Sequence, residues 1–461
     1  MGKNAKKVKD EFSPRFSEGM LWSSRGVSQS INIIILGYIS MYCSDILGIP
    51  IGWVGTIMMV SKVFDGVTDV VVGYIIDRTN TKLGKGRPYE LCLLGYWGCT
   101  VLLFACPSGW ETMVKCVWIF AMYTMINSIF GTFLSSAIVP YTIRAFNSQQ
   151  KYVTYGVYGG LMSMVAAIII NVAFPIMMVR LGTSAAGWTI MIASIAIPAT
   201  IIGLLRFFFI PEKYNVDAQT DKIDMKAVFE CLKTNKYIYV VALMMLIYNL
   251  VTNLGITTYY YKYIVGNLEL MSIASALSAV MIPMLLIAPA VMKKISAARF
   301  CMYGCLACVF GYVLNWFAGA NFPMLIVAGL FTGAGVIPIS MFSSLLTIEC
   351  ADYNEYIGKP RMEGTLGAIT GLGSKLGSAF GTFILGALLS MAGYISTSDD
   401  VTVDQPGSAL FMIRIIMSFL PALLYLLVAI ACGCYGLDKK IGGIREELEV
   451  RRAQREDYKA K

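Results

Sequence analysis

The chain has 461 residues, of which 57% are hydrophobic and only 14% are charged, and its formal net charge is +9. Soluble domains carry nearer to a quarter of charged residues, so this composition favours a membrane protein. The sequence contains no histidine, which excludes imidazole proton relays, zinc–histidine sites and Ser-His or Cys-His catalysis.

Apolar runs long enough to cross a membrane recur about twelve times along the chain. Backbone groups in lipid must be hydrogen-bonded internally, so long apolar runs predict helices, whereas a β-barrel would show short alternating segments. The sequence therefore predicts an all-α membrane protein with twelve transmembrane helices. The predicted spans are 20–47, 50–76, 89–106, 113–141, 153–180, 185–210, 237–262, 270–292, 300–318, 321–346, 364–394 and 408–436.

A long polar segment, 211–236, divides the predicted spans six and six. Two six-helix bundles across a linker are typical of transporters built from paired repeats. A weak internal repeat agrees, because "TYGVYGGLMS" in the fifth span resembles "TLGAITGLGS" in the eleventh. The predicted parts are an N-terminal segment (1–19), a first bundle (20–210), the linker (211–236), a second bundle (237–436) and a tail (437–461).

Lysine and arginine residues gather at both ends of the chain, in the linker and in the loop after the second span, whereas the last opposite loop, "STSDDVTVDQPG", is acidic. The positive-inside rule then places both termini in the cytoplasm. Topology explains the basic charge better than binding of nucleic acid does. We expect a multi-pass protein of the cell membrane whose first span is retained, because it is too long for the core of a signal peptide.

Three charged residues interrupt the second span. Lys62, Asp65 and Asp69 are spaced i, i+3 and i+7, so they lie on one helix face, with Thr68 beside them. A charge at this depth needs a partner or a wet cavity. One interpretation is an internal salt bridge that joins helices. The other is a site for Na⁺, Li⁺ or H⁺, because two carboxylates one turn apart coexist when they share a proton or a cation.

Two further charges lie in later spans. Lys375, in the middle of the eleventh span, requires an anion, and Asp65 or Asp69 is the expected partner. Arg414 lies nearer the outer edge of the twelfth span, where it either extends to the membrane surface or faces the transport pathway.

Four stretches resemble the glycoside–pentoside–hexuronide:cation symporter family, a branch of the major facilitator superfamily. They are "MYCSDILGI" (41–49), "DGVTDVVVGYIIDRTNTKLGKGRPY" (65–89), "YTMIN" (123–127) and "CADYNEYIGKPRMEG" (350–364), and Lys375 follows at the distance that this family shows. The resemblance covers nearly the whole chain. It implies the twelve-helix major facilitator fold and symport of a sugar-like solute with a cation.

The resemblance also implies roles for single residues. The cation-binding residues would be Asp65, Asp69, Thr68 and Thr124, with Lys62 and Lys375 forming a charge network around them. The substrate-binding positions would be Gln29, Asn127, Gly156 and Arg414. At the first three, the family's galactoside transporters carry two acids and an arginine, so both a neutral glycoside and an acidic one remain possible here.

The stretch "DRTNTKLGKGRP" follows the charged face and is interpreted as a topology signal, a cytoplasmic latch, or both. The predicted cytoplasmic gate comprises Asp77, Arg78, Lys85, Arg87, Asp352, Glu355, Arg361 and Glu363.

The sequence thus predicts a secondary symporter that imports a glycoside, pentoside or hexuronide with Na⁺ or H⁺ by alternating access. The alternative is an uncoupled facilitator, or a transporter of lipid or another organic solute, within the same superfamily. An enzyme is not expected, because no nucleophile motif, HExxH, GxSxG or P-loop is present. We expect a monomer in contact with membrane lipid and no cofactor, resident metal or nucleic-acid partner beyond the coupling ion.

Overall fold

The computed structural model describes residues 15–79, 81–146, 149–214, 234–277, 295–359, 363–397 and 404–448. Helices make up most of these residues, and the described ranges contain no β-strand beyond an isolated bridge between Thr81 and Gly84. The chain divides into two compact units. Unit 1 comprises Met1–Thr220, Asn267–Ala276 and Gly386–Ala409, and unit 2 comprises Asp221–Gly266, Leu277–Leu385 and Leu410–Lys461.

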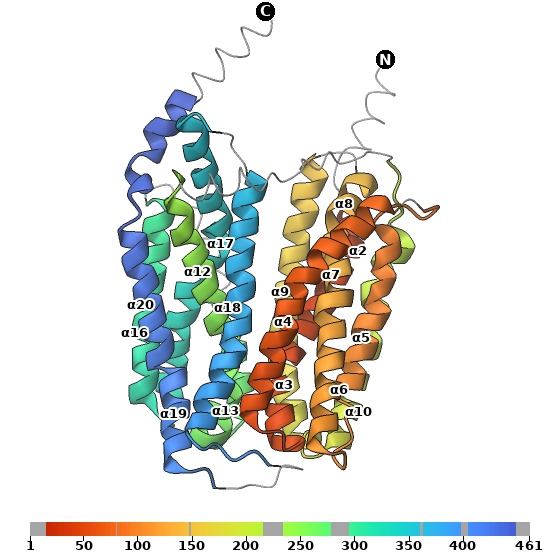
Figure 1. Ribbon diagram of the computed structural model, residues 1–461, viewed down its shortest axis with the longest axis vertical. Coiled ribbons are helices and arrows are strands. Elements are labelled where there is room, and N and C mark those ends of the chain that lie inside the picture. Colours follow the sequence, from red (N-terminus) through yellow and green to blue (C-terminus); the bar gives the residue numbers. More distant parts are fainter. Residues whose placement is uncertain are drawn as a thin grey trace, which may run out of the picture. The chain divides into compact units, whose positions relative to one another are not determined.

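The helices of unit 1 lie side by side along their lengths, and α2 packs closely against α9 and α10 (Figure 1). They are α2 (Phe16–Leu36), α3 (Ile39–Met41), η1 (Tyr42–Ile46), α4 (Ile51–Arg78), η2 (Arg87–Leu91), α5 (Cys92–Leu103), α6 (Thr112–Thr124), η3 (Met125–Gly131), α7 (Thr132–Ser136), α8 (Ile138–Ala145), α9 (Gln149–Leu181), α10 (Ala185–Phe209) and most of α14 (Glu269–Leu277).

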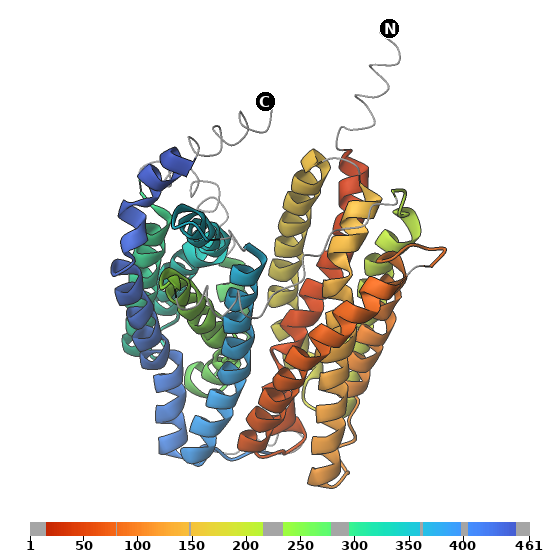
Figure 2. The same ribbon diagram turned by 45° about the horizontal axis from the view of Figure 1, so that its top comes forward.

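In unit 2, α16 packs against α17 and α20, and Figure 2 shows these three helices together. The helices of this unit are α12 (Tyr237–Thr252), α13 (Ile256–Tyr260), η4 (Tyr261–Val265), α16 (Ala297–Ala318), α17 (Phe322–Tyr356), α18 (Glu363–Met391), α19 (Gly407–Met417), α20 (Phe419–Gly433) and η6 (Gly436–Lys439). The last residues of α18, from Gly386, and the first of α19 belong to unit 1.

The helices are long and apolar, as the sequence predicts for a chain that satisfies its backbone in lipid. Within the described ranges, nine helical segments are long and apolar enough to cross a membrane. The 28-residue α4, which carries Lys62, Asp65 and Asp69, is not among these nine. Most of the predicted span 270–292 lies outside the described residues.

Small residues allow α16 and α17 to pack closely in unit 2. A Cβ atom on Gly304 would lie 2.6 Å from the carbonyl oxygen of Gly335, so glycine is required for this approach. Cys301, Cys305 and Cys308 are fully buried on the same face of α16, and the Cys301 thiol donates to the Pro338 carbonyl at 3.5 Å. The three cysteines therefore act as small packing residues in this core.

The glycine-rich loop after α4 folds around a carboxylate. The backbone N–H groups of Lys85, Gly86 and Arg87 donate to the Glu212 carboxylate at 2.9, 2.8 and 2.6 Å. Gly84 has φ +114°, a conformation that glycine adopts without strain, and a Cβ there would lie 2.3 Å from the Glu212 carboxylate. Glu212 thereby joins this loop to the segment that follows α10.

Candidate cation and substrate site

A row of polar side chains lies where α4 meets α6, η3 and α7 in unit 1. Its centre is Ser61, which is fully buried. The Thr124 hydroxyl lies 3.0 Å from the Ser61 hydroxyl, and the Ser128 hydroxyl donates to the Ser61 carbonyl at 3.2 Å. These contacts satisfy polar groups that would otherwise be buried without partners, and they align the two helices next to the charged residues of α4.

Asp65 follows Ser61 one turn later on α4. Its Oδ1 atom accepts a hydrogen bond from the hydroxyl of Thr132, the first residue of α7, at 3.1 Å. Thr132 is buried, with 3% of its surface exposed, whereas Asp65 and Asp69 are half-buried. The structure therefore adds Thr132 as a neighbour of the predicted cation carboxylate. The sequence prediction missed it because Thr132 lies outside the matched "YTMIN" stretch.

The hydroxyl of Thr68, which was predicted to bind the cation, donates to the backbone of its own helix. That hydroxyl donates to two carbonyls of its own helix, those of Phe64 at 3.2 Å and Asp65 at 3.1 Å. Such back-bonding is usual for threonine in a helix, and it leaves the oxygen lone pairs available as acceptors.

Lys62 extends toward the predicted substrate residue Asn127. The Lys62 ammonium lies 3.5 Å from Asn127 Oδ1 and 5.9 Å from the centre of the Tyr123 ring. The Asn127 amide nitrogen donates to the Tyr123 carbonyl at 3.0 Å, which fixes the orientation of the amide. The structure thus brings together Lys62 and Asn127, which the sequence assigned to two different roles.

The helix that carries Asn127 is irregular. Residues Met125–Gly131 form a π-helix, η3, between the α-helical segments α6 and α7. Turns of this kind are rare and occur frequently at functional sites, because they change which side chains and carbonyls face a neighbouring helix.

Among the described residues, no three His, Cys, Asp or Glu side chains gather as they would around a resident metal ion. Two carboxylates with hydroxyl and carbonyl oxygens near them are, in contrast, the hard oxygen donors that suit a small cation. In unit 1 the predicted donors are Asp65, Asp69 and Thr124, and Thr132 is the neighbour that the structure adds to Asp65.

The remaining substrate candidates lie on three other helices. Gln29 is partly exposed on α2, and Gly156 lies on α9, where an added Cβ would meet no atom within 4 Å. Arg414 belongs to unit 2, where its guanidinium donates to the Trp316 carbonyl at 3.0 Å and stacks on the ring of the same residue. Arg414 is thus held within its own unit.

Lys375 lies half-buried on α18 in unit 2, whereas Asp65 and Asp69 belong to unit 1. The expected pairing of Lys375 with one of these carboxylates stays a prediction.

The predicted gate residues fall into three groups. In unit 1, Arg87 donates to the Phe207 carbonyl at 2.9 Å, and Arg78 lies over the Tyr74 ring. In unit 2, Asp352 accepts a hydrogen bond from Arg445 Nε at 3.1 Å, and Glu355 is half-buried on the same helix. The side chains of Asp77, Arg361 and Glu363 lie outside the described residues.

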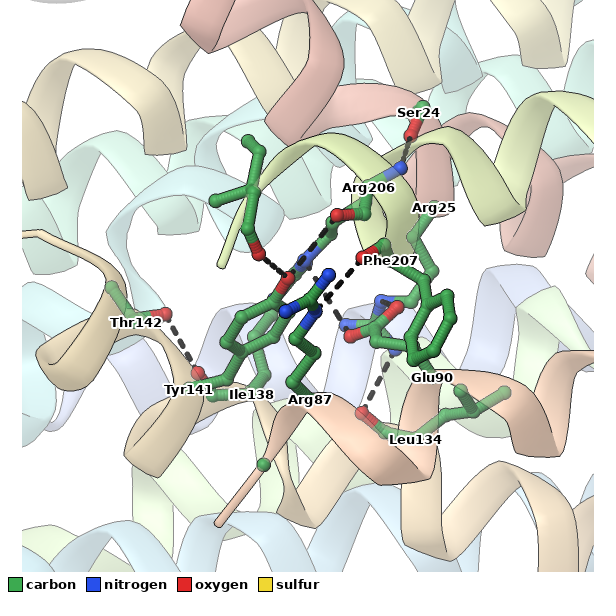
Figure 3. Close-up of polar contacts among 12 residues, drawn as sticks. Ser24, Arg25, Arg87, Glu90, Leu134, Ile138, Tyr141, Thr142, Arg206 and Phe207 are labelled. Carbon is green, nitrogen blue, oxygen red and sulfur yellow. Dashed lines mark hydrogen bonds and ion pairs between the residues drawn. The ribbon is translucent and has the colours of Figure 1, made fainter. Parts of the chain in front are cut away.

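A buried charge cluster that the sequence prediction missed joins α2, η2 and α10 (Figure 3). Glu90 lies between two arginines, with its carboxylate 3.7 Å from Arg25 Nε and 3.5 Å from Arg206 Nε, and all three residues are at most 3% exposed. The Arg206 guanidinium stacks on Trp22 and Tyr141. A charged residue inside the first apolar run, Arg25, was the signal in the sequence.

Asp45, in the "MYCSDILGI" stretch, has a structural role in unit 1. Its side chain is fully buried, and its Oδ1 atom accepts hydrogen bonds of 2.6 Å from the hydroxyls of Ser44 and Tyr394. Asp45 therefore anchors the segment after α18 to the end of η1 within unit 1.

The chain matches the model of the family described as MFS/sugar transport protein over residues 28–439. It belongs to this family, a branch of the major facilitator superfamily. The resemblance to glycoside–pentoside–hexuronide:cation symporters is thereby confirmed. The protein is a transporter and not an enzyme, and it is a multi-pass protein of the cell membrane.

Two similar proteins illustrate the family. The chain is 26% identical to the isoprimeverose transporter of Lactiplantibacillus pentosus, covering 96% of this chain and 92% of the relative. It is 24% identical to the glucuronide carrier protein homolog of Escherichia coli (strain K12), covering 90% of this chain and 91% of the relative.

Solved structures share the fold. A bacterial homolog of the human lysosomal transporter Spinster superposes with a TM-score of 0.66 at 11% identity, over 92% of this chain and 96% of the other. The nucleoside transporter NupG superposes with a TM-score of 0.60 at 12% identity, over 91% and 98% of the two chains. The fold of this transporter family member is therefore that of the superfamily.

Proposed function

We propose that this family member is a secondary symporter that moves a sugar-type solute, a glycoside, pentoside or hexuronide, together with Na⁺, Li⁺ or H⁺ by alternating access. The observation that carries the proposal is the adjacency of two groups in unit 1. Asp65 accepts a hydrogen bond from Thr132, which directly follows η3, and Lys62 contacts Asn127, which lies on η3. A cation site and a polar solute site would then share one helix.

The chemistry of the two groups fits these roles. Carboxylates with nearby hydroxyls bind a small hard cation or a proton. An amide next to an ammonium group can accept and donate hydrogen bonds to sugar hydroxyls, and the ammonium also favours an acidic sugar. The two relatives are named for isoprimeverose and for a glucuronide, so these two kinds of sugar are the first probes to use.

Coupling follows from the cost of removing charge from water. With both carboxylates ionised and no cation bound, closing a cavity around them removes charge from water, which is unfavourable. Binding of a cation neutralises part of this charge. It thereby permits the change between the outward-facing and inward-facing conformations. Alternating access therefore takes place with the cation and the solute bound together.

The test uses de-energised membrane vesicles that contain the protein, with Na⁺ and pH electrodes in the medium. Isoprimeverose, methyl β-D-glucuronide and melibiose are added one at a time. We expect one of them to cause loss of Na⁺ or alkalinisation of the medium. Asp69→Asn should abolish the signal because it removes a cation carboxylate, while Asp404→Asn, at an exposed loop position, should preserve it.

Each contrary result has a defined meaning. Uptake of a radiolabelled probe without movement of either ion would identify an uncoupled facilitator. An unchanged electrode signal with Asp69→Asn would remove this carboxylate from the coupling mechanism. No response to any probe, with the protein folded and inserted, would indicate a solute outside the sugar class.

A further inference from the structure

The Thr132 hydroxyl has two possible acceptors. It lies 3.1 Å from Asp65 Oδ1 and 3.3 Å from the backbone carbonyl oxygen of Asn127. A hydroxyl carries a single proton, so it can donate one strong hydrogen bond at a time. One acceptor belongs to the candidate cation site and the other to the residue that contacts Lys62.

The π-helix creates this choice. Hydroxyls in regular helices donate to carbonyls three or four residues earlier. Thr56, Ser135 and Thr142 in this chain follow that pattern, with Gly52, Gly131 and Ile138 as acceptors. Thr132 instead reaches the carbonyl five residues earlier, because it directly follows the wide turns of Met125–Gly131. Asn127 and Asp65 therefore come within reach of the same hydroxyl.

Binding of a cation at Asp65 decides between the two acceptors. A hydrogen bond to an ionised carboxylate is roughly twice as strong as one to a neutral carbonyl, so the empty, charged site holds the hydroxyl on Asp65. A cation bound to Asp65 takes up that negative charge. The hydroxyl proton is then better placed on the Asn127 carbonyl, with the oxygen lone pairs directed at the cation.

We propose that Thr132 is a positioning residue that couples occupation of the cation site to Asn127, by transferring its hydrogen bond from Asp65 to the Asn127 carbonyl. This inference rests on the proposed symport. Asn127 is in turn connected to Lys62 and to the Tyr123 carbonyl through its side chain. A change at the Asn127 backbone would therefore alter the polar surface offered to the solute.

The experiment measures coupling between cation and sugar in the purified full-length protein. The half-maximal Na⁺ concentration for thermal stabilisation is determined without and with a saturating probe sugar, at constant ionic strength set by choline chloride. The probes are isoprimeverose, methyl β-D-glucuronide and melibiose, and parallel series replace Na⁺ by Li⁺ or by a change of pH. Coupling between two ligands typically shifts each affinity by about 5- to 150-fold.

Four variants isolate the hydroxyl. Thr132→Val keeps the shape and removes the hydroxyl, Thr132→Ala provides a second hydroxyl-free variant should the first not fold, and Thr132→Ser retains the hydroxyl. Thr142→Val makes the same change at a threonine whose hydroxyl donates within its own helix, to the Ile138 carbonyl. We expect the sugar-induced shift to fall to within about twofold of no shift in the hydroxyl-free variants, while Thr132→Ser and Thr142→Val keep the wild-type coupling.

The outcomes separate this inference from the function on which it rests. A coupled wild type with equally coupled hydroxyl-free variants would overturn the role of Thr132 and leave the symport in place. Loss of coupling in Thr132→Ser as well would also overturn it, because the hydroxyl would then not be the active group. A wild type that shows no coupling between any cation and any probe would remove the proposed symport, and this inference with it.

Discussion

At the scale of the residue, the glycine-rich loop depends on one backbone conformation. Gly84 adopts a positive φ beside the Glu212 carboxylate, and the three following N–H groups donate to that carboxylate. From the sequence alone, the stretch that ends in "GKGRP" was interpreted as a topology signal, a cytoplasmic latch, or both. The structure shows that backbone N–H groups of the loop bind the carboxylate of Glu212.

We therefore expect Gly84→Ala to destabilise the protein by about 2–4 kcal/mol, because the new Cβ strains the backbone and displaces a carboxylate from charged hydrogen bonds. Thermal melting of the purified protein in detergent checks this. Gly442→Ala is the matched control, since its helical position has open space around the added Cβ and no positive φ. Equal melting temperatures for Gly84→Ala and wild type would contradict the tight fit around Gly84.

At the scale of the element, buried charges rather than apolar contacts alone hold the middle of α2 to η2 and to the end of α10. Arg25 donates to the Leu134 carbonyl at 2.8 Å, and the Arg206 backbone accepts a hydrogen bond from Tyr141 at 3.2 Å. Glu90 supplies the carboxylate between the two guanidinium groups. The cluster connects three segments that are distant in the sequence, so these three helices should behave as one body.

Glu90→Gln should lower the free energy of unfolding by about 3–5 kcal/mol, because it leaves two buried guanidinium groups without their carboxylate. Glu269→Gln makes the same change at an exposed position on α14 and should have little effect. Chemical unfolding followed by tryptophan fluorescence compares the two variants with the wild type. Similar small effects for both substitutions would mean that the ion pairs add no net stability.

At the scale of the whole molecule, charge distribution determines how the chain enters the membrane. Basic residues dominate the ends and the linker, and the loop "STSDDVTVDQPG" is acidic. The positive-inside rule then predicts cytoplasmic termini, with this loop on the opposite side. The described residues contain nine apolar segments that suit spanning, and the family match runs through both halves of the chain.

We expect an epitope tag at the C-terminus to be inaccessible to antibody in intact spheroplasts and accessible after permeabilisation. The same tag inserted after Ser398, in the acidic loop, should be accessible in both. A C-terminal tag that binds antibody in intact spheroplasts would reverse the predicted orientation.

Much of the candidate site could be predicted from local patterns. The spacing of Lys62, Asp65 and Asp69 places them on one helix face, and α4 is a continuous helix through all three. The predicted contact of Lys375 with Asp65 or Asp69 involves two different units and stays a prediction. Thr132 and Ser61 could not be predicted, because threonine and serine in apolar helices most often bond to their own backbone.

The sequence by itself determined the helical membrane class, the family and the position of the charged face, because the length of apolar runs and the cost of buried charge depend on neighbouring residues along the chain. Only the tertiary structure decided which hydrogen-bond partners the charged side chains have. Thr132 lies 67 positions from Asp65, and Glu212 lies 125 to 127 positions from the loop that binds it. Contacts at such separations depend on how helices pack against one another, which no local pattern encodes.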